Sequence, residues 1–271
     1  MTRRSPRILT IAGSDSGGGA GIQADLKTFT AHGAFGMSAV TALTAQNTVG
    51  VRAVHRAPAD FVAAQIDAVC EDIPPDAVKV GMLADAAIVA AVADRLRAWS
   101  GPPLVVDPVM MAASGDPLLA DDAVETLRER LLPLATVVTP NLPEAERLAG
   151  RVTSTLAERR ALAAELGRQS GAALLLKGGH APGEEIVDLL WHDGRIEEVA
   201  HPRLPTRAGH GTGCALASAI AVRLGRGEPL VDACRGAIAW LSVALSEAEP
   251  IGRGSGPVDF LWTVRREGRF A

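Results

Sequence analysis

The sequence predicts an α/β fold with a mainly parallel central sheet that helices cover on both faces. Short continuous apolar runs of strand length alternate with longer segments whose apolar residues recur at helical spacing. Because both faces of such strands are apolar, helices must cover both sides of the sheet. The chain has 271 residues, of which 48% are hydrophobic, and neither a linker-like stretch nor a repeat of fixed period interrupts it. We therefore expect residues 1–271 to form one domain.

In the first half of the chain, strands and helices follow each other in a regular order. The strand expected at residues 7–12 leads into a loop, residues 13–21, that contains five glycines, and then into a helix over residues 22–32. Residues 37–48 are apolar and rich in threonine, as strands are, and a short extended segment follows at 51–55. Apolar periodicity then predicts a helix ending near Cys70, a strand at 77–80 and a helix around 88–99.

The second half continues the alternation and adds a hairpin. We expect strands at 104–106, 136–139 and 172–176, and helices over 124–131 and 156–169. Pro143 suits the first turn of another helix. Residues 186–191 and 195–200, separated by His-Asp-Gly, predict a hairpin. A glycine-rich turn at 209–213 opens a helix that reaches Leu224, a last long helix covers 234–245, and a short helix is expected after the loop at 252–257.

The overall charge and the cysteine content exclude several classes of protein. A net charge of −4 argues against nucleic acid or an anionic membrane as the main partner. No apolar run reaches the length of a membrane span, and the run at residues 8–12 is too short for a signal peptide. Three cysteines without a Cys-x-x-Cys pair indicate neither a disulfide framework nor a zinc site. We therefore expect a soluble cytoplasmic protein.

Lysine is rare in this chain, which makes each lysine informative. The chain has three, Lys27, Lys79 and Lys177, against 24 arginines. Where only a positive surface charge is needed the chain uses arginine, so the remaining lysines favour sites that need a compact ammonium group. For Lys27 and Lys79, chance occurrence stays open as the alternative.

The turn at residues 209–213 has the pattern of an anion-binding site. Glycines at 209, 211 and 213 let bare backbone N–H groups approach a ligand. The helix that follows adds the positive end of its dipole, which suits a phosphate. Cys214 lies in its first turn, where the same field acts on a thiol. The alternative is a simple helix-starting turn with a small buried cysteine.

Ligands of an open parallel sheet bind beyond the carboxyl ends of its strands. This chain places the parts needed for phosphoryl transfer there: carboxylates for magnesium, a lysine for phosphate, and an N–H cradle. Taken singly, each has a structural alternative. Asp107 before Pro108 could merely end a strand, and Glu144 and Asp25 could be acids of a first helical turn. An amide such as Gln46 suits a heterocycle edge, but it could also belong to a turn.

Eight segments taken together resemble the hydroxymethylpyrimidine/phosphomethylpyrimidine kinases of thiamine biosynthesis. They cover nearly the whole chain in order: residues 13–29, 44–48 (TAQNT), 79–83 (KVGML), 106–109 (VDPV), 114–118 (SGDPL), 139–144 (TPNLPE), 176–180 (LKGGH) and 210–214 (HGTGC). The resemblance implies a ribokinase-like three-layer α/β/α fold, ATP and Mg²⁺ as cofactors, and a homodimer. It also implies phosphorylation of 4-amino-5-hydroxymethyl-2-methylpyrimidine and then of its monophosphate to the diphosphate.

The resemblance also implies a role for individual residues. Gln46 matches the residue that reads the pyrimidine edge, and the residues expected around the ring are Gly13, Asp25, Met82 and Val109. Lys177 matches the lysine that reaches the ATP phosphates, with Asn141 and Thr212 as further nucleotide contacts. Glu144, in the element Asn-x-x-Glu, and Asp107 are the expected magnesium residues. The N–H groups of Gly211, Thr212 and Gly213 would stabilise the transferred phosphoryl group.

Cys214 occupies the position at which most of the wider superfamily carries an aspartate base. We expect a catalytic role for it, because the helix field favours the thiolate, although a spacer role stays open. The nearest rival function is a pyridoxine or pyridoxal kinase of the same fold. A non-catalytic vitamin-binding protein is the rival from another class, but it would be expected to have lost Lys177 or Glu144, and both are present.

Overall fold

A nine-stranded sheet runs through the computed structural model, which describes residues 4–112 and 114–266. The strand order is β3-β2-β1-β4-β5-β6-β7-β8-β9. Six neighbouring strands are parallel: β2 (Phe35–Asn47), β1 (Arg7–Asp15), β4 (Ala77–Val80), β5 (Leu104–Val106), β6 (Val137–Val138) and β7 (Ala173–Leu176). The sequence prediction of a mainly parallel sheet is confirmed.

Antiparallel strands close both ends of the sheet. At one end β3 (Gly50–Arg56) returns along β2. At the other end β8 (Glu185–His192) and β9 (Arg195–Pro202) form the predicted hairpin beside β7. A strand is present at each position where the sequence predicts one. In the segment expected at 136–139, the strand is limited to Val137–Val138.

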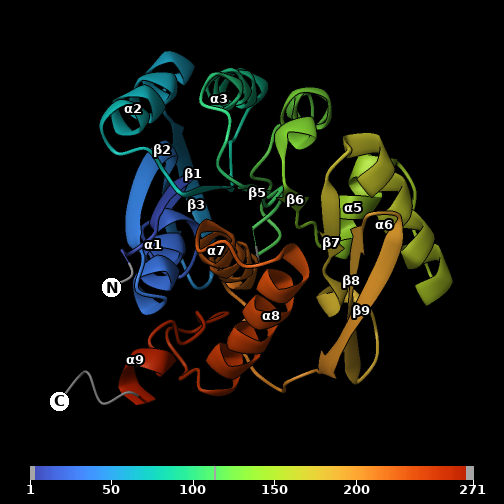
Figure 1. Cartoon of the computed structure of the whole chain (residues 1–271). Helices are drawn as coiled ribbons and strands as arrows, with labels where there is room; N and C mark the ends of the chain where they lie inside the picture. The colour runs from blue at the N-terminus through green and yellow to red at the C-terminus, as the bar shows by residue number, and fades with distance from the viewer. Residues whose placement is uncertain (1–3, 113, 267–271) are drawn as a thin grey trace.

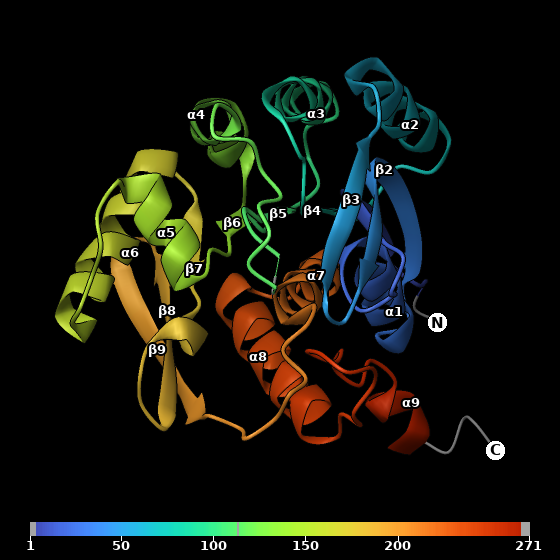
Figure 2. The same ribbon diagram turned by 180° about the vertical axis from the view of Figure 1, so that it is seen from behind.

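Helices cover both faces of the sheet, so the fold has three layers (Figures 1 and 2). On one face lie α2 (Ala59–Asp72), α3 (Ala86–Ala98), α4 (Ala123–Thr126), α5 (Leu142–Ala149) and α6 (Leu156–Ser170). On the other lie α1 (Gly21–Ala31), α7 (Thr212–Gly225) and α8 (Leu230–Ser246), while α9 (Trp262–Arg266) is near the C-terminal end. Alternating strand residues supply the two cores: Val105 packs toward α7 and α8, and Val106 toward the opposite layer.

One predicted helix is divided in the structure. The segment expected as a helix over 124–131 begins as α4, passes into a π-helical turn at Leu127–Leu131 and ends in a 3₁₀ turn at Leu132–Leu134. Pro133 has no N–H to donate, so a regular α-helical ladder cannot continue through it. The apolar spacing identified the helix, but it could not show that the hydrogen-bond pattern changes along it.

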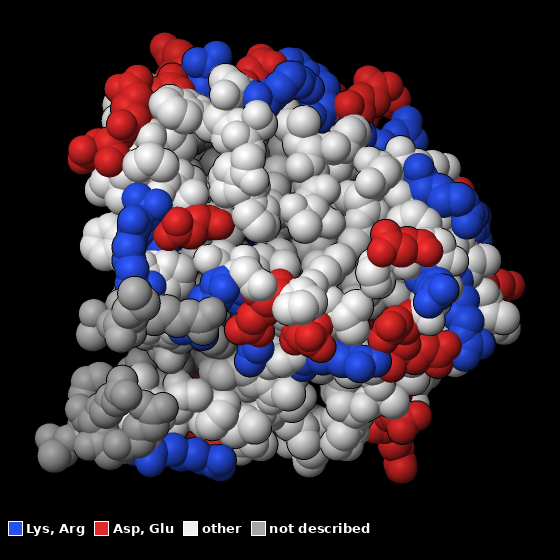
Figure 3. Space-filling view, in the orientation of Figure 1, with Lys and Arg blue, Asp and Glu red and all other residues white. Residues whose placement is uncertain are grey.

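The surface carries intermingled charges of both signs. In Figure 3, acidic and basic side chains are intermingled around the periphery and in a band across the lower middle of the face shown, and the area above this band is largely uncharged. Among the residues that the structure describes, no helix is both long and apolar enough to cross a membrane.

The strand order sets the position of the functional site. After β1 the chain adds β2 on one side of β1, and it later places β4 on the other side of β1. At such a reversal the loops after neighbouring strands diverge and leave a crevice at the carboxyl edge of the sheet. The loops after β1, β4, β5, β6 and β7 all end at this edge.

Candidate active site

A cavity of about 550 Å³ opens at the carboxyl edge of the parallel strands. Its size is within the usual range for small-molecule sites. All but one of the residues predicted for the site line it, namely Gly13, Gln46, Met82, Asp107, Val109, Asn141, Glu144, Lys177, Gly211, Thr212, Gly213 and Cys214. The exception is Asp25. Strand ends and one helix start therefore bring together residues from nearly the whole length of the chain.

The start of α7 forms one wall of the cavity and has the geometry of an anion-binding turn. Gly211 precedes the helix with a φ of +76°, a conformation that favours glycine. A side chain there is also excluded by space, since a Cβ atom would lie 1.9 Å from the carbonyl oxygen of Gly19. No side chain caps α7. Its first N–H groups are therefore available to a ligand in the cavity.

Lys177 and Asp107 form a buried ion pair beneath this turn. Lys177 follows β7, and its Nζ lies 2.8 Å from Oδ1 of Asp107, which follows β5. A Cβ atom at Gly213 would lie 3.2 Å from both Lys177 Nζ and Asp107 Oδ2, so the pair and the turn are in close proximity. Burial lowers the pKa of the Lys177 ammonium, but Asp107 and Glu144 outweigh this effect and raise it. Lys177 is therefore charged at neutral pH.

The predicted Asn-x-x-Glu element is also the N-terminal cap of α5. The Asn141 side chain accepts a hydrogen bond from the Glu144 N–H at 2.9 Å, and Glu144 Oε2 accepts one from the Asn141 N–H at 2.8 Å. This reciprocal capping box fixes the Glu144 carboxylate in place. Burial raises the pKa of Glu144 to about 7, with Lys177 acting against it and Asp107 adding to it. Asn141 and Glu144 therefore cap α5 and also line the cavity, so the motif can serve the helix and the site at once.

The charge balance at this point fits a divalent cation. Two buried carboxylates, Asp107 and Glu144, accompany a single ammonium group, Lys177, and Glu144, with its pKa raised to about 7, would give up its proton to a bound divalent cation. Among the described residues there is no cluster of three or more histidines, cysteines or carboxylates that would bind a metal alone. Mg²⁺ commonly takes one or two carboxylates together with phosphate oxygens and water. The donors present thus fit magnesium that arrives with a nucleotide.

The protonation of Cys214 differs from the sequence expectation. Its thiol lines the cavity at the start of α7. Burial raises the pKa of this thiol to about 11; Lys79 acts in the opposite direction but does not compensate, and Asp25 and Asp107 raise the pKa further. The surroundings of Cys214 therefore favour the neutral thiol rather than the thiolate that the helix field was expected to favour. Desolvation and two nearby carboxylates outweigh the field, so the thiol is protonated at neutral pH.

Asp25 does not lie where a ring contact was expected. Its side chain is fully buried between α1 and the sheet. Both carboxylate oxygens accept hydrogen bonds from Lys79 Nζ at 2.8 and 2.9 Å, and the hydroxyls of Thr10 and Ser218 bind at 2.6 and 2.7 Å. This correction has a simple reason: the carboxylate is saturated inside the protein. The signal available in the sequence was Lys79, a lone charge within an apolar strand, which needs a buried partner.

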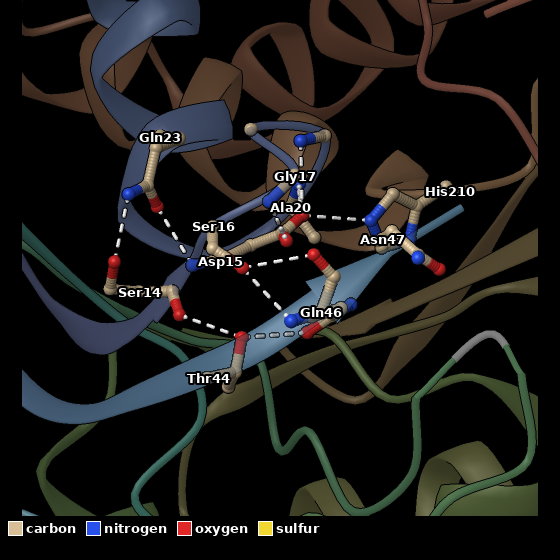
Figure 4. A network of polar contacts seen from close by, with 12 residues as sticks. Ser14, Asp15, Ser16, Gly17, Ala20, Gln23, Thr44, Gln46, Asn47 and His210 are labelled. Carbon is tan, nitrogen blue, oxygen red and sulfur yellow. Dashed lines mark hydrogen bonds and ion pairs between the residues drawn. The ribbon is translucent and has the colours of Figure 1, made fainter. Parts of the chain in front are cut away.

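Figure 4 shows a further pair that sequence reasoning missed, Asp15 and His210. The Asp15 carboxylate accepts the N–H groups of Gly17, Gly19 and Ala20 at 2.8 to 3.0 Å and His210 Nε2 at 2.8 Å. Burial raises the pKa of Asp15, but the bond from His210 and these N–H groups outweigh it, so the pKa is lowered. One carboxylate thus connects the glycine loop after β1 to the anion-binding turn. The sequence offered one indication of this role, because Asp15 lies in a glycine-rich loop and aspartates bind the backbone N–H groups of such loops.

The same view shows how Gln46 is held at the end of β2 (Figure 4). Ser16 Oγ accepts from the Gln46 N–H and donates to the Gln46 carbonyl, both at 2.9 Å. Thr44 Oγ1 donates to Gln46 Oε1 at 3.1 Å. The Gln46 amide is therefore presented to the cavity from a backbone that is fixed on both sides.

Comparison with known proteins agrees with this geometry. The family model for phosphomethylpyrimidine kinase matches residues 15–259. This chain belongs to the phosphomethylpyrimidine kinase family. It is 52% identical to the hydroxymethylpyrimidine/phosphomethylpyrimidine kinase of Rhizobium meliloti, over 92% of this chain and 95% of that protein. It is 49% identical to the thiamine biosynthesis bifunctional protein of Geobacter sulfurreducens, of whose length it spans 54%.

Solved structures identify the fold of this family member. The phosphomethylpyrimidine kinase of Clostridium difficile superposes with a TM-score of 0.79 at 41% identity, over 89% of this chain and 99% of that one. The ADP complex of Bacillus subtilis pyridoxal kinase superposes with a TM-score of 0.88 at 32% identity, over 97% and 100%. The predicted ribokinase-like fold is thereby confirmed.

Proposed function

We propose that this kinase transfers the γ-phosphoryl group of ATP to 4-amino-5-hydroxymethyl-2-methylpyrimidine and to its monophosphate, two steps of thiamine biosynthesis. The observation that carries the proposal is one cavity that joins a fixed amide, Gln46, to a lysine, two carboxylates and an anion-binding turn. The amide suits the amino and ring-nitrogen edge of a pyrimidine, because it offers an acceptor and a donor side by side. The R. meliloti relative carries the name of this activity.

The chemistry requires mainly positioning and electrostatics. Gln46, Gly13, Met82 and Val109 line the cavity and would hold the ring so that its hydroxymethyl group faces the start of α7. Asp107 and Glu144 would hold magnesium that arrives with ATP, and this ion would supply charge neutralisation at the phosphates.

At the start of α7, the N–H groups of residues 211–213 and the Lys177 ammonium stabilise the charge on the transferred phosphoryl oxygens. Most analyses give such transfers a loose transition state, in which the acceptor needs little deprotonation. A protonated Cys214 is compatible with this, acting as a neutral group beside the acceptor oxygen.

The nucleotide assignment rests on related proteins and on the cavity. The B. subtilis pyridoxal kinase that superposes on nearly the whole chain was solved with ADP. In this chain Lys177, Asn141 and Thr212 line the cavity on the side of the anion-binding turn and would contact the nucleotide phosphates. The described cysteines Cys70, Cys214 and Cys234 are free, as in proteins of reducing compartments, and we place the reaction in the cytoplasm.

A second candidate substrate is pyridoxal. The overall shape of the chain superposes better on a pyridoxal kinase than on a phosphomethylpyrimidine kinase, with TM-scores of 0.88 and 0.79. Sequence identity orders them the other way, at 32% and 41%. We therefore expect pyridoxal to be a slow side substrate.

The test is an ATP-consumption assay with the hydroxymethylpyrimidine, its monophosphate and pyridoxal side by side. We expect turnover of both pyrimidines, with a kcat/KM for pyridoxal at least tenfold lower. Turnover of pyridoxal alone would make the chain a pyridoxal kinase. An absence of turnover with all three, at saturating ATP and Mg²⁺, would refute the proposal in favour of a binding protein.

The assembly we propose is a homodimer formed through the β2–β3 edge of the sheet. β3 is an edge strand whose outer side pairs with no other strand of the described residues. Apolar side chains of this hairpin are exposed: Leu43 by 55%, Val49 by 61% and Val54 by 39%. A bare edge strand with exposed apolar residues favours association.

A further inference from the structure

We propose that His210 binds the phosphate group of the monophosphate substrate and so serves the second phosphorylation rather than the first. This inference rests on the function proposed above. The two reactions differ in their acceptor, which is a neutral alcohol in the first and a phosphate monoester in the second. The second reaction brings an additional phosphate group into a cavity that already receives ATP. It therefore needs a hydrogen-bond donor that the first reaction does not need.

His210 is held in one orientation by its surroundings. Its side chain is 8% exposed, and Nε2 lies 2.8 Å from Asp15 Oδ2. A carboxylate with a lowered pKa accepts hydrogen bonds only, so Nε2 carries the proton. The ring also lies against Gly19, where a Cβ atom would meet His210 Cδ2 at 2.4 Å. The peptide N–H of His210 is bonded to the carbonyl of Gly256 at 3.1 Å. Neither the ring nor its backbone is free to turn.

The second ring nitrogen of His210 is left for a ligand. Within residues 4–112 and 114–266, Nδ1 has no hydrogen-bond partner, and it is absent from the polar atoms enclosed without one. The ring lines the main cavity, together with Gly211 and Cys214. Because Asp15 accepts the hydrogen bond from Nε2, a phosphate oxygen that binds the ring would accept one from Nδ1. The resulting Nδ1–H···O bond to a phosphate would be charge-assisted.

A second cavity provides the space that the longer substrate needs. It measures about 230 Å³ and shares Gln46, His210 and Ser255 with the main cavity. In both reactions the reacting oxygen must meet the same anion-binding turn and Lys177. The ring of the monophosphate must therefore lie farther from the turn, by the length of one phosphate group. His210 stands where the two cavities join, beside the residue proposed to read the ring.

The other basic side chains of the cavity are less suited to this task. Lys177 is paired with Asp107, and Arg147 is paired with Asp121. His180 lines the cavity too, but burial and the neighbouring Lys177 lower its pKa, which disfavours a second proton. Among the described histidines that line the cavity, His210 is the one that a buried carboxylate holds at one ring nitrogen while the other ring nitrogen has no hydrogen-bond partner.

The test compares His210→Gln with wild type on both pyrimidine substrates. We expect kcat/KM for the monophosphate to fall at least tenfold more than kcat/KM for the alcohol, mainly through KM. The control is His192→Gln, at the surface turn between β8 and β9, which should leave both values unchanged. Equal losses on both substrates would mean that His210 only positions the glycine loop, and no loss would remove it from the site. Either result overturns the proposal.

A measurement on the wild-type protein decides the matter if the variant does not fold. Long-range ¹⁵N–¹H NMR spectra of the histidine rings are recorded without nucleotide, with either the alcohol or the monophosphate added. We expect the Nδ1 resonance of His210 to shift to the protonated range with the monophosphate only. An unchanged resonance refutes the role of His210. A wild-type enzyme that phosphorylates neither pyrimidine would instead refute the proposed function itself.

Discussion

The thiol of Cys214 stands beside the proposed acceptor oxygen, and its protonation state decides what it can contribute. Since its pKa is raised to about 11, it cannot serve as a resident base at neutral pH. We expect Cys214→Ala to retain activity, with kcat lowered by about tenfold or less, whereas removal of a general base typically costs 10²–10⁴-fold. Alkylation of the wild-type thiol by iodoacetamide should be slow at pH 7.5. A thousandfold loss of kcat in the variant, together with rapid alkylation of the wild type, would show that Cys214 is a thiolate base.

At the residue scale, the sequence was most informative where function depends on strand ends. Lys177, Glu144 and Asp107 could be assigned because each follows a recognisable strand, and parallel strands bring such positions to one edge. Pairs between distant segments could not be assigned. Asp25 meets Lys79 across 54 positions and Asp15 meets His210 across 195. No local pattern encodes such a pairing, so Asp25 could not be separated from a ligand contact and the role of Asp15 was missed.

At the scale of the element, α5 and α6 offer a matched pair. Both begin with a complete capping box, Asn141 with Glu144 and Thr155 with Glu158, but only the first lines the cavity. Glutamine preserves a capping box and removes the charge. We expect Glu144→Gln to lower kcat at least tenfold and to raise the Mg²⁺ concentration needed for half-maximal rate. Glu158→Gln should leave both unchanged. Similar effects of the two variants would mean that Glu144 acts only as a helix cap.

The end of α1 makes the stability of the protein depend on pH. His32 Nδ1 donates to the Thr28 carbonyl at 2.9 Å, while Nε2 is buried beside Trp240 and has no partner among residues 4–112 and 114–266. Burial lowers the pKa of His32 from 6.5 to about 4. Between these values the unfolded chain binds a proton that the folded chain does not. Stability is therefore complete above pH 6.5 and decreases as the pH falls toward 4, by roughly 2–3 kcal/mol.

Urea unfolding at pH 7.5 and pH 4.5 measures this effect. His32→Phe keeps an aromatic ring against Trp240 and cannot titrate, so its loss of stability between the two pH values should be smaller than that of wild type. Other groups contribute equally to both proteins, and the difference isolates His32. An identical loss in the two proteins would contradict the lowered pKa.

At the scale of the whole molecule, sequence periodicity predicted the layers of the fold but could not predict the order of its strands. Apolar alternation identified the strands and the covering helices, because each must bury its apolar face. The placement of β4 beside β1 rather than beside β3 depends on contacts between remote segments. Local pattern could not supply that arrangement, and the resemblance to a known family implied only the ribokinase-like three-layer fold.

The proposed dimer interface and the active site share one hairpin. The hairpin proposed as the dimer interface also carries Thr44 and Gln46, which face the cavity. A partner that covers β3 would hold the hairpin, and with it the amide proposed to read the ring. We expect wild type to have twice the mass of one chain by light scattering, and the double variant Leu43→Glu/Val54→Lys to be monomeric.

The monomeric variant should also show a KM for the pyrimidine raised several-fold, with the KM for ATP little changed, because only the substrate side of the cavity loses support. Val152→Glu is the matched control, since Val152 is 81% exposed in the connection between α5 and α6 and lies outside the hairpin. It should change neither mass nor KM. A wild-type protein with the mass of one chain would refute the dimer, and a monomeric variant with unchanged KM values would separate assembly from substrate recognition.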